Sequence, residues 1–118
     1  MKKNHEDHEE HEVHRHLGPG FIESIYQKAM CYELGVLGIT FEREKELIIR
    51  YKDLDITGQR LDMLVEKKLI VELKAVDLVL PIHEAQLISY LKTTGIRAGL
   101  IINFKVKQLK LGIKRIVL

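Results

Sequence analysis

The stretch "IVELKAVDLVLPIHEAQLISYLKTTG" (Ile70–Gly95) decides the fold of this chain, because a strand pattern in it is followed by a helix pattern. The apolar run "LIVELKAV", residues 69–76, predicts a strand buried within a sheet. Pro81 suits the first turn of a helix and Gly95 suits the turn that ends it. We therefore expect a helix over residues 81–94.

Further strands are expected on both sides of this unit. The segment "QRLDMLVE", residues 59–66, precedes it and is joined to it by a short "KK" link, which predicts an antiparallel hairpin. The segment "AGLIINF", residues 98–104, is another buried strand, and the helix between it and residues 69–76 allows the two strands to be parallel. The segment "KRIVL", residues 114–118, predicts a short last strand.

The N-terminal half predicts one more helix and one long strand. A helix is expected from Phe21 to about Gly35 or Gly38, because apolar residues recur there at helical spacing. These apolar residues are Phe21, Ile25, Ala29, Tyr32 and Val36. The segment "ITFEREKELIIRYK", residues 39–52, alternates and predicts one strand, and "DLDITG", residues 53–58, predicts the turn after it.

The order of these elements indicates an α/β fold. A helix, three strands, a helix and two strands are expected to form a mixed β-sheet flanked by α-helices. The length of 118 residues suits one compact domain. We assign residues 17–118 to this domain and residues 1–16 to a polar, histidine-rich N-terminal segment, which is either a tail or a first helix.

Composition excludes several classes of site. Cys31 is the only cysteine, so an internal disulfide and a cysteine-rich zinc or iron–sulfur site within one chain are excluded. A reducing cytoplasm is the simplest expected location. No apolar run is long enough to cross a membrane and no cleavable signal pattern is present. The net charge of +2 neither demands nor excludes a nucleic-acid partner.

The N-terminal segment "MKKNHEDHEEHEVHRH" has histidines at every third position. His5, His8, His11 and His14 would drift slowly around a helix, so neighbouring pairs could share a transition-metal ion. A solvated, partly frayed helix or tail explains the same composition. Both interpretations stay open from the sequence alone.

Charged residues in the middle of the buried strand suggest chemistry. Glu72 and Lys74 are two residues apart, so they share one face of the strand. In a suitable register Asp62, on the preceding strand, faces Glu72 across the hairpin at roughly 5 Å between Cβ atoms. Two carboxylates this close repel each other unless a proton or a cation lies between them. A hard divalent ion such as Mg²⁺ is the natural cation, and Lys74 could then orient a water molecule that attacks phosphorus.

The two expected helices add polar residues at regular spacing. Gln86 and Tyr90 are four residues apart and share one helical face, as do Glu23 and Tyr26 at a spacing of three. Each pair has an ordinary explanation by itself: surface polarity for the first pair, and a favourable helix-dipole interaction for Glu23. An E-x-K pattern on a strand is likewise often an exposed ion pair. The set in this order is more specific than its members.

That ordered set resembles the PD-(D/E)xK nuclease superfamily in its RecB-like branch. The shared pattern is Asp62, then Glu72-Leu73-Lys74, then Gln86 to Tyr90. More closely, "LGPGFIESIYQKAMCYEL" and "LDMLVEKKLIVELKAV" resemble the bacterial and archaeal Gly-x-x-Glu-x-x-Tyr proteins, whose motif is here Gly20, Glu23 and Tyr26. The resemblance runs from about Val13 to the C-terminus.

The resemblance implies a restriction-endonuclease-like fold and a nuclease activity. It implies that Asp62 and Glu72 bind Mg²⁺ or Mn²⁺, with Glu23 supporting the metal. It further implies that Lys74 assists the attacking water, and that Gln86 and Tyr90 line the catalytic site. The expected substrate is nucleic acid, DNA rather than RNA, and the expected assembly is a homodimer. A binding module that keeps the fold without catalysis is the alternative, and metal binding by the histidine-rich segment is a further one.

Two features depart from the superfamily pattern. Residue 61 is Leu where the superfamily name has Pro, and the segment "NHEDHEEHE" lacks the apolar face expected of a first helix. A substrate path is indicated by basic residues near the C-terminus, although a solvated basic surface would look the same. These residues are Lys105, Lys107, Lys110, Lys114 and Arg115.

Overall fold

The computed structural model describes residues 9–118 as three helices, seven strands and one 3₁₀ turn. The elements in chain order are α1 (Glu9–Leu17), α2 (Glu23–Val36), β1 (Phe41–Glu46), β2 (Ile49–Tyr51), β3 (Leu54–Ile56), β4 (Arg60–Val65), β5 (Leu69–Lys74), α3 (Pro81–Thr94), β6 (Ala98–Asn103), η2 (Leu109–Gly112) and β7 (Ile113–Val117). No helix in this described part of the chain is both long and apolar enough to span a membrane.

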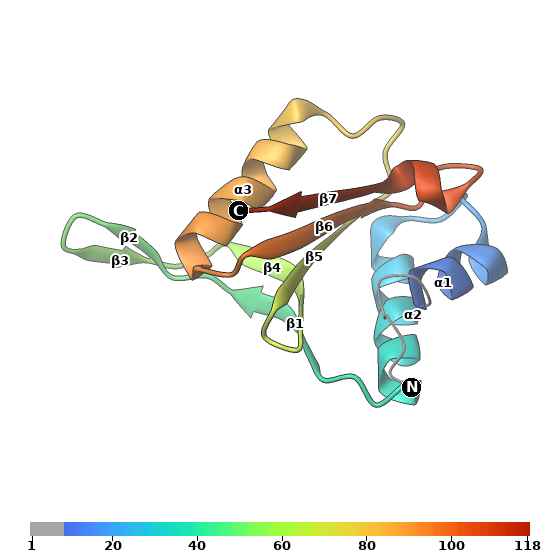
Figure 1. Cartoon of the computed structure of the whole chain (residues 1–118), viewed down its shortest axis with the longest axis horizontal. Coiled ribbons are helices and arrows are strands. Elements are labelled where there is room, and N and C mark those ends of the chain that lie inside the picture. The colour runs from blue at the N-terminus through green and yellow to red at the C-terminus, as the bar shows by residue number, and fades with distance from the viewer. Residues whose placement is uncertain (1–8) are drawn as a thin grey trace.

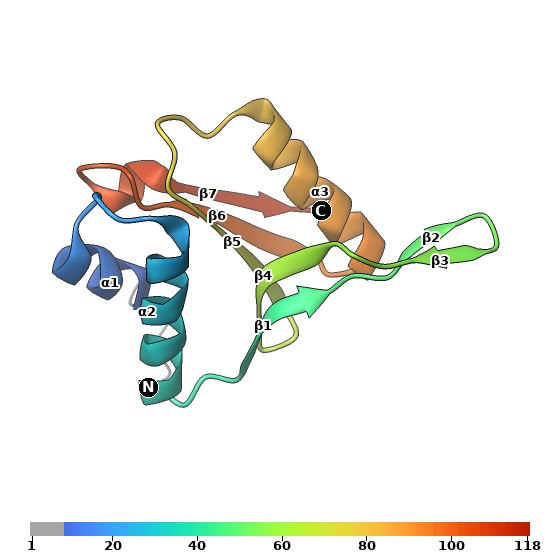
Figure 2. The ribbon, with the colours of Figure 1, turned by 180° about the vertical axis from the view of Figure 1, so that it is seen from behind.

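Five strands form one mixed sheet in the order β1-β4-β5-β6-β7. Strand β5 pairs antiparallel with β4 and parallel with β6, which confirms both the expected hairpin and the expected crossover through α3. Helices α1 and α2 cover one face of the sheet and α3 covers the other (Figure 1; Figure 2 shows the opposite side). The predicted mixed sheet flanked by helices is therefore confirmed.

The central strand β5 contributes to a core on each face of the sheet. Leu69, Val71 and Leu73 belong to the cluster beneath α1 and α2, whereas Ile70 belongs to the cluster beneath α3. This alternation follows from the two-residue period of a strand. Close packing of α3 requires a glycine in β6, since a Cβ atom added at Gly99 would lie 2.7 Å from a methyl group of Leu87.

The prediction of one long strand over residues 39–52 was wrong. Strand β1 ends at Glu46, and β2 and β3 form a separate hairpin that projects from the body of the molecule (Figure 1). The turn of this hairpin lies at residues 52–53, not at the predicted 53–58, and Lys52 has a φ of 55°. Two-residue hairpin loops need such positive φ angles, and no glycine marks this one in the sequence.

Helix α2 forms as predicted but does not pack through the predicted apolar stripe. Tyr32 is 69% exposed and Val36 is also exposed. The buried face is instead made of Tyr26, Gln27, Met30 and Leu34. Apolar residues occur on two sides of this helix, so spacing alone could not select the side that faces the sheet.

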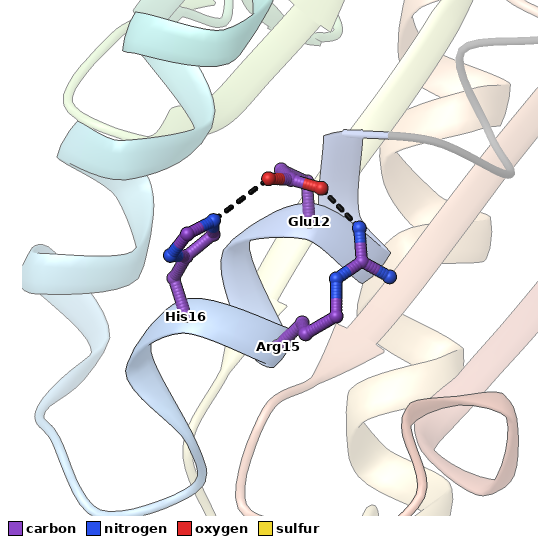
Figure 3. A network of polar contacts seen from close by, with 3 residues as sticks. All are labelled: Glu12, Arg15 and His16. Atoms are coloured by element: carbon purple, nitrogen blue, oxygen red, sulfur yellow. Dashed lines mark hydrogen bonds and ion pairs between the residues drawn. The ribbon is translucent and has the colours of Figure 1, made fainter.

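The described part of the histidine-rich segment is helical, and α1 packs Val13 into the core. Glu12 accepts a hydrogen bond from His16 at 2.8 Å and pairs with Arg15 (Figure 3). The ring of His14 instead lies beside the core, where its Nε2 donates to the carbonyl of Val106 at 2.7 Å. His5 and His8 lie outside the described residues, and the boundary between residues 16 and 17 stays a prediction.

Candidate active site

The carboxylates of Asp62 and Glu72 meet where β4 and β5 separate. The ladder between these strands ends at the pair Met63 and Val71, so Asp62 and Glu72 occupy the next position in register. There the backbone N–H of Asp62 donates to Oε2 of Glu72 at 3.0 Å, and the N–H of Leu73 donates to Oδ2 of Asp62 at 2.8 Å. Each strand thus donates one backbone N–H to a carboxylate of the other strand.

This arrangement raises the pKa of both acids. Glu72 is 5% exposed, and burial, followed by repulsion from Asp62, raises its pKa to about 8. Burial likewise raises the pKa of Asp62, although the Leu73 N–H and the charge of Lys74 oppose the rise. Near neutral pH the isolated pair therefore retains a proton, unless a cation stabilises the second negative charge.

Glu23 and Lys74 complete the charged group around these acids. Glu23 is the first residue of α2, and its pKa is raised by desolvation and then by the charge of Asp62. Lys74 ends β5 and is half-buried, and its charge lowers the pKa of each of the three acids. One helix (α2) and two strands (β4 and β5) therefore place one ammonium among three carboxyl groups.

A pocket of about 230 Å³ opens between α2 and the sheet at this point. Glu23 and Asp62 line it, together with Ser24, Gln27, Glu44 and Leu73. It gives solvent-sized molecules and ions direct access to Asp62. The fold thus leaves an approach to the acids from the α2 side of the sheet.

The residues of α3 predicted to line the site differ in their placement. Tyr90 is buried, and its pKa is raised by burial and then by the charge of Glu72, so it belongs to the group. Its hydroxyl accepts a hydrogen bond from Nε2 of Gln59. Gln86 is partly exposed, and its side chain makes no hydrogen bond within residues 9–118. Its role in the site stays a prediction.

Tyr26 serves the core rather than the charged group. Its ring stacks on Phe104 with centroids 4.4 Å apart. Its hydroxyl donates to the carbonyl of Gly18 at 2.6 Å and accepts from the N–H of Phe21 at 3.1 Å. Tyr26 therefore holds the loop that leads into α2. Glu23, the first residue of α2, follows this loop directly.

Sequence reasoning missed a polar link between α2 and the strands. Gln27 is 8% exposed, and its Nε2 donates to Oε2 of Glu44 at 2.8 Å and to the carbonyl of Asp62 at 3.4 Å. Its Oε1 accepts from Arg43 at 3.2 Å. Gln27 lies one helical turn after Glu23, which was the only available signal.

Glu44 lies beside Asp62 on the other side, in a distorted part of β1. The pairing of β1 with β4 runs through Arg43 and Lys45 but omits the pair of Glu44 with Asp62, and Glu44 has a φ of 50°. A positive φ in a non-glycine residue is uncommon and typical of sites under constraint. Both strand partners of Asp62 thus depart from regular pairing at this residue.

Asn103 is a second missed residue and stabilises the end of β5. It is buried at the end of β6, where its Oδ1 accepts from the N–H groups of Val76 at 3.1 Å and Lys105 at 3.3 Å. Its Nδ2 donates to the carbonyl of Val76 at 2.9 Å. Asn103 thereby fixes the loop directly after Lys74.

The donors present suit a hard divalent cation. Asp62 and Glu72 each have one oxygen held by a backbone N–H, and within residues 9–118 the other oxygen of each accepts no hydrogen bond. Oxygen donors of this kind bind Mg²⁺ or Mn²⁺, which keep several water ligands. No three histidine, cysteine or acidic side chains in the described range converge as metal ligands. A site here therefore fits two carboxylates completed by water and substrate.

The basic residues near the C-terminus do not form one surface. Lys114 and Arg115 are neighbours on β7 and so point to opposite faces of the sheet. Lys114 lies 3.8 Å from Glu84 of α3, and Lys105 pairs with Asp77 at 2.7 Å. Lys105 is the member of this set that approaches the site.

Comparison with known proteins gives one family. A family model described as the PD-(D/E)XK nuclease superfamily matches residues 8–116. The five-stranded mixed sheet flanked by three helices agrees with the restriction-endonuclease-like fold. Neither a curated protein nor a solved structure matches the chain.

Proposed function

We propose that this chain, which belongs to the PD-(D/E)XK nuclease superfamily, hydrolyses phosphodiester bonds with the help of a divalent metal ion. The observation that best supports this function is a pair of hydrogen bonds between β4 and β5: the Glu72 carboxylate accepts from the backbone of β4, and the Asp62 carboxylate accepts from the backbone of β5. We propose DNA as the preferred substrate. We also propose membership of the Gly-x-x-Glu-x-x-Tyr proteins, through Gly20, Glu23 and Tyr26.

Asp62 and Glu72 are the proposed metal ligands, with Mg²⁺ or Mn²⁺ as the ion. When bound, the ion lowers the pKa of a coordinated water and neutralises charge on the phosphate. The backbone bonds to both acids hold their oxygens in place before substrate arrives, so little reorganisation is needed during the reaction. Glu23 accepts hydrogen bonds from water at the entrance of the site.

Lys74 is the proposed residue that acts on the attacking water and the developing charge. Its ammonium is close enough to all three acids to shift their pKa values. An ammonium there can orient water toward phosphorus and stabilise the negative charge that builds up on the phosphate oxygens. Gln86 and Tyr90 are proposed to line the site, and the Tyr90 hydroxyl is held by Gln59.

The test is cleavage of single-stranded, duplex and branched DNA, and of RNA, by the purified protein with Mn²⁺ or Mg²⁺. Replacement Glu72→Gln keeps the shape of the side chain and removes its charge, so we expect cleavage to be lost. Glu46→Gln, at an exposed position on β1, is the matched control and should cleave normally. Cleavage that persists unchanged in Glu72→Gln would overturn the proposed function.

A non-catalytic binding module is the second candidate, favoured by the pKa of about 8 for Glu72. If no cation reaches the pair, Glu72 stays protonated near neutral pH and acts only as a structural acid. Calorimetry separates the two functions: nucleic-acid binding without any binding of Mg²⁺ or Mn²⁺ favours the module. Binding of one metal ion that is lost in Asp62→Asn favours the nuclease.

Assembly and location complete the proposal. We propose a homodimer, because cyclic dimers are the commonest oligomers, and a cytoplasmic location, because the single Cys31 suits a reducing compartment. Light scattering over a range of protein concentrations tests the first. A monomer at the highest concentration would contradict it.

A further inference from the structure

A larger pocket adjoins the candidate active site on the other side of Glu23. Its volume is about 460 Å³, which is within the usual range for sites that hold a small organic group. Glu23 lines both this pocket and the smaller one at Asp62. The remaining lining residues are Pro19, Gly20, Phe21, Ile22, Ala75 and Lys105. The lining is therefore mostly apolar, with one carboxylate, from Glu23, and one ammonium, from Lys105.

The aromatic residue that lines this pocket has a held backbone and an exposed ring. Phe21 is 50% exposed. Its backbone N–H donates to the Tyr26 hydroxyl at 3.1 Å, and its ring makes an edge contact with the Tyr26 ring at 6.4 Å. Because the Tyr26 hydroxyl also donates to the Gly18 carbonyl, the loop backbone that carries Phe21 is held in place before any ligand binds.

Gly20 keeps the pocket open without being needed by the backbone. A Cβ atom added at Gly20 would meet no atom within 4 Å, and the φ of this residue is not in the left-handed range. Folding therefore places no requirement for glycine here. The absence of a side chain matters instead for the space beside Phe21, which Gly20 lines.

Lys105 contributes a positive charge to the lining of this pocket. Its backbone is held by Asn103, and its ammonium bonds Asp77 at 2.7 Å. Both partners of this ion pair are largely exposed, so the pair contributes little stability. The ammonium can therefore turn from Asp77 to a phosphate at small cost.

We propose that this pocket binds an unpaired base of a single-stranded nucleic acid. The base stacks on Phe21 and a neighbouring phosphate contacts Lys105. Every base has an aromatic face that stacks on such a ring, whereas in a duplex both faces are covered by neighbouring bases. This inference rests on the proposed function, because the shared Glu23 would place the bound nucleotide next to the metal-binding acids.

The first test measures binding without cleavage, in the Glu72→Gln protein, by fluorescence anisotropy of oligodeoxythymidine, oligouridine and a DNA duplex. Phe21→Ala should weaken binding of the single strands by about 5- to 100-fold, which is the usual range for loss of one stacked base. Phe21→Trp should restore it. Tyr32→Ala is the control: it removes an exposed aromatic ring (69% exposed) from α2, outside the pocket lining, and should change nothing.

The second test fills the pocket rather than emptying it. Gly20→Leu should weaken binding of single strands, whereas Gly35→Leu should not. Gly35 is the matched control because an added Cβ there also meets no atom within 4 Å, and it lies outside the pocket lining. Thermal melting of each variant checks that the fold is retained, which separates a blocked pocket from a damaged one.

The outcomes distinguish this inference from the proposed function. Unchanged single-strand affinity in Phe21→Ala and Gly20→Leu, tighter binding of the duplex, or no binding at all would overturn the pocket assignment, even if Glu72-dependent cleavage is found. Loss of affinity in both variants supports it, even if no variant shows metal-dependent cleavage. Comparison of oligodeoxythymidine with oligouridine identifies the strand as DNA or RNA.

Discussion

The chain contains two antiparallel hairpins with very different surroundings. In β4–β5 nearly every side chain is buried between the helices, and Asp62 and Glu72 are held by backbone N–H groups. In β2–β3 all six strand residues are exposed, and the hairpin projects away from the sheet (Figure 2). An isolated two-stranded hairpin is only marginally stable in water. Burial on both faces allows polar groups to be positioned accurately, which is why we place the proposed chemistry in the first hairpin.

The largest expected effect is on catalysis. Asp62→Asn should lower the rate of metal-dependent cleavage by about 100-fold or more, because it removes one of the two charged ligands that we propose for the metal. Asp55→Asn, the same change in the exposed hairpin, should leave the rate unchanged. Steady-state cleavage assays at saturating Mn²⁺ compare the two. Equal losses of rate in the two variants would contradict the placement of the proposed catalytic site in β4–β5.

A large effect on stability should follow the same division. Ile70→Ala in β5 should lower the free energy of unfolding by roughly 2–5 kcal/mol, because it opens a cavity beneath α3. Ile49→Ala in β2 should change it by less than about 0.5 kcal/mol. Urea unfolding of each variant gives these values. A marked loss in Ile49→Ala would mean that the projecting hairpin packs against something in solution.

The pKa of Glu72 predicts how stability depends on pH. The folded protein holds this proton up to about pH 8, whereas the unfolded chain releases it near its ordinary value of 4.5. Between these limits the metal-free folded state should lose stability as pH rises, by on the order of a few kcal/mol in total. Glu72→Gln should flatten the curve, and Mg²⁺ should stabilise the native protein more at high pH than at low pH.

Metal-free urea unfolding at a series of pH values measures this dependence. The matched comparison is Asp55→Asn in the exposed hairpin, which should keep the slope of the unchanged protein. A Glu72→Gln curve with that same slope would show that Glu72 does not titrate in this window.

The smallest predicted effect concerns the link from α2 to the strands. Gln27→Ala should lower the cleavage rate by roughly 10-fold, since Asp62 and Glu44 lose their hydrogen-bond partner, in the range usual for residues that support a ligand. The apparent affinity of the Gln27→Ala protein for Mn²⁺ should fall together with its cleavage rate. A loss of stability alone would not lower the affinity of the folded protein. Arg50→Ala, which breaks the exposed Arg50–Asp55 ion pair of the other hairpin, should alter neither.

The sequence predicted best those helices and strands whose local residue pattern matches their burial in the folded protein. The hairpin β4–β5 and the helix α3 were foreseen because buried strands are apolar and because Pro81 and Gly95 mark the ends of the helix. The break after β1 was not foreseen, since residues 47–52 continue a strand pattern while leaving the sheet. Local preference could not reveal that no neighbouring strand receives them.

The candidate site divides in a similar way. Asp62, Glu72 and Lys74 could be named from the sequence because charges in an apolar strand are costly and conspicuous. Gln27 and Glu44 could not be named from the sequence. Each is an ordinary polar residue in its own segment, and only the packing of α2 against the strands brings the two together. Tyr26 was singled out by a motif, but only its packing on Phe104 reveals that it supports a loop.

The sequence by itself determined the unit of β4, β5, α3 and β6 and the positions of the unusual charges, because both depend on neighbours along the chain. Only the tertiary structure decided which face of α2 is buried, where the strand pairing breaks at Asp62, and which loop lies beside Glu23. Those features depend on contacts between segments far apart in the chain. The local sequence is compatible with several arrangements, and packing and desolvation determine which of them forms.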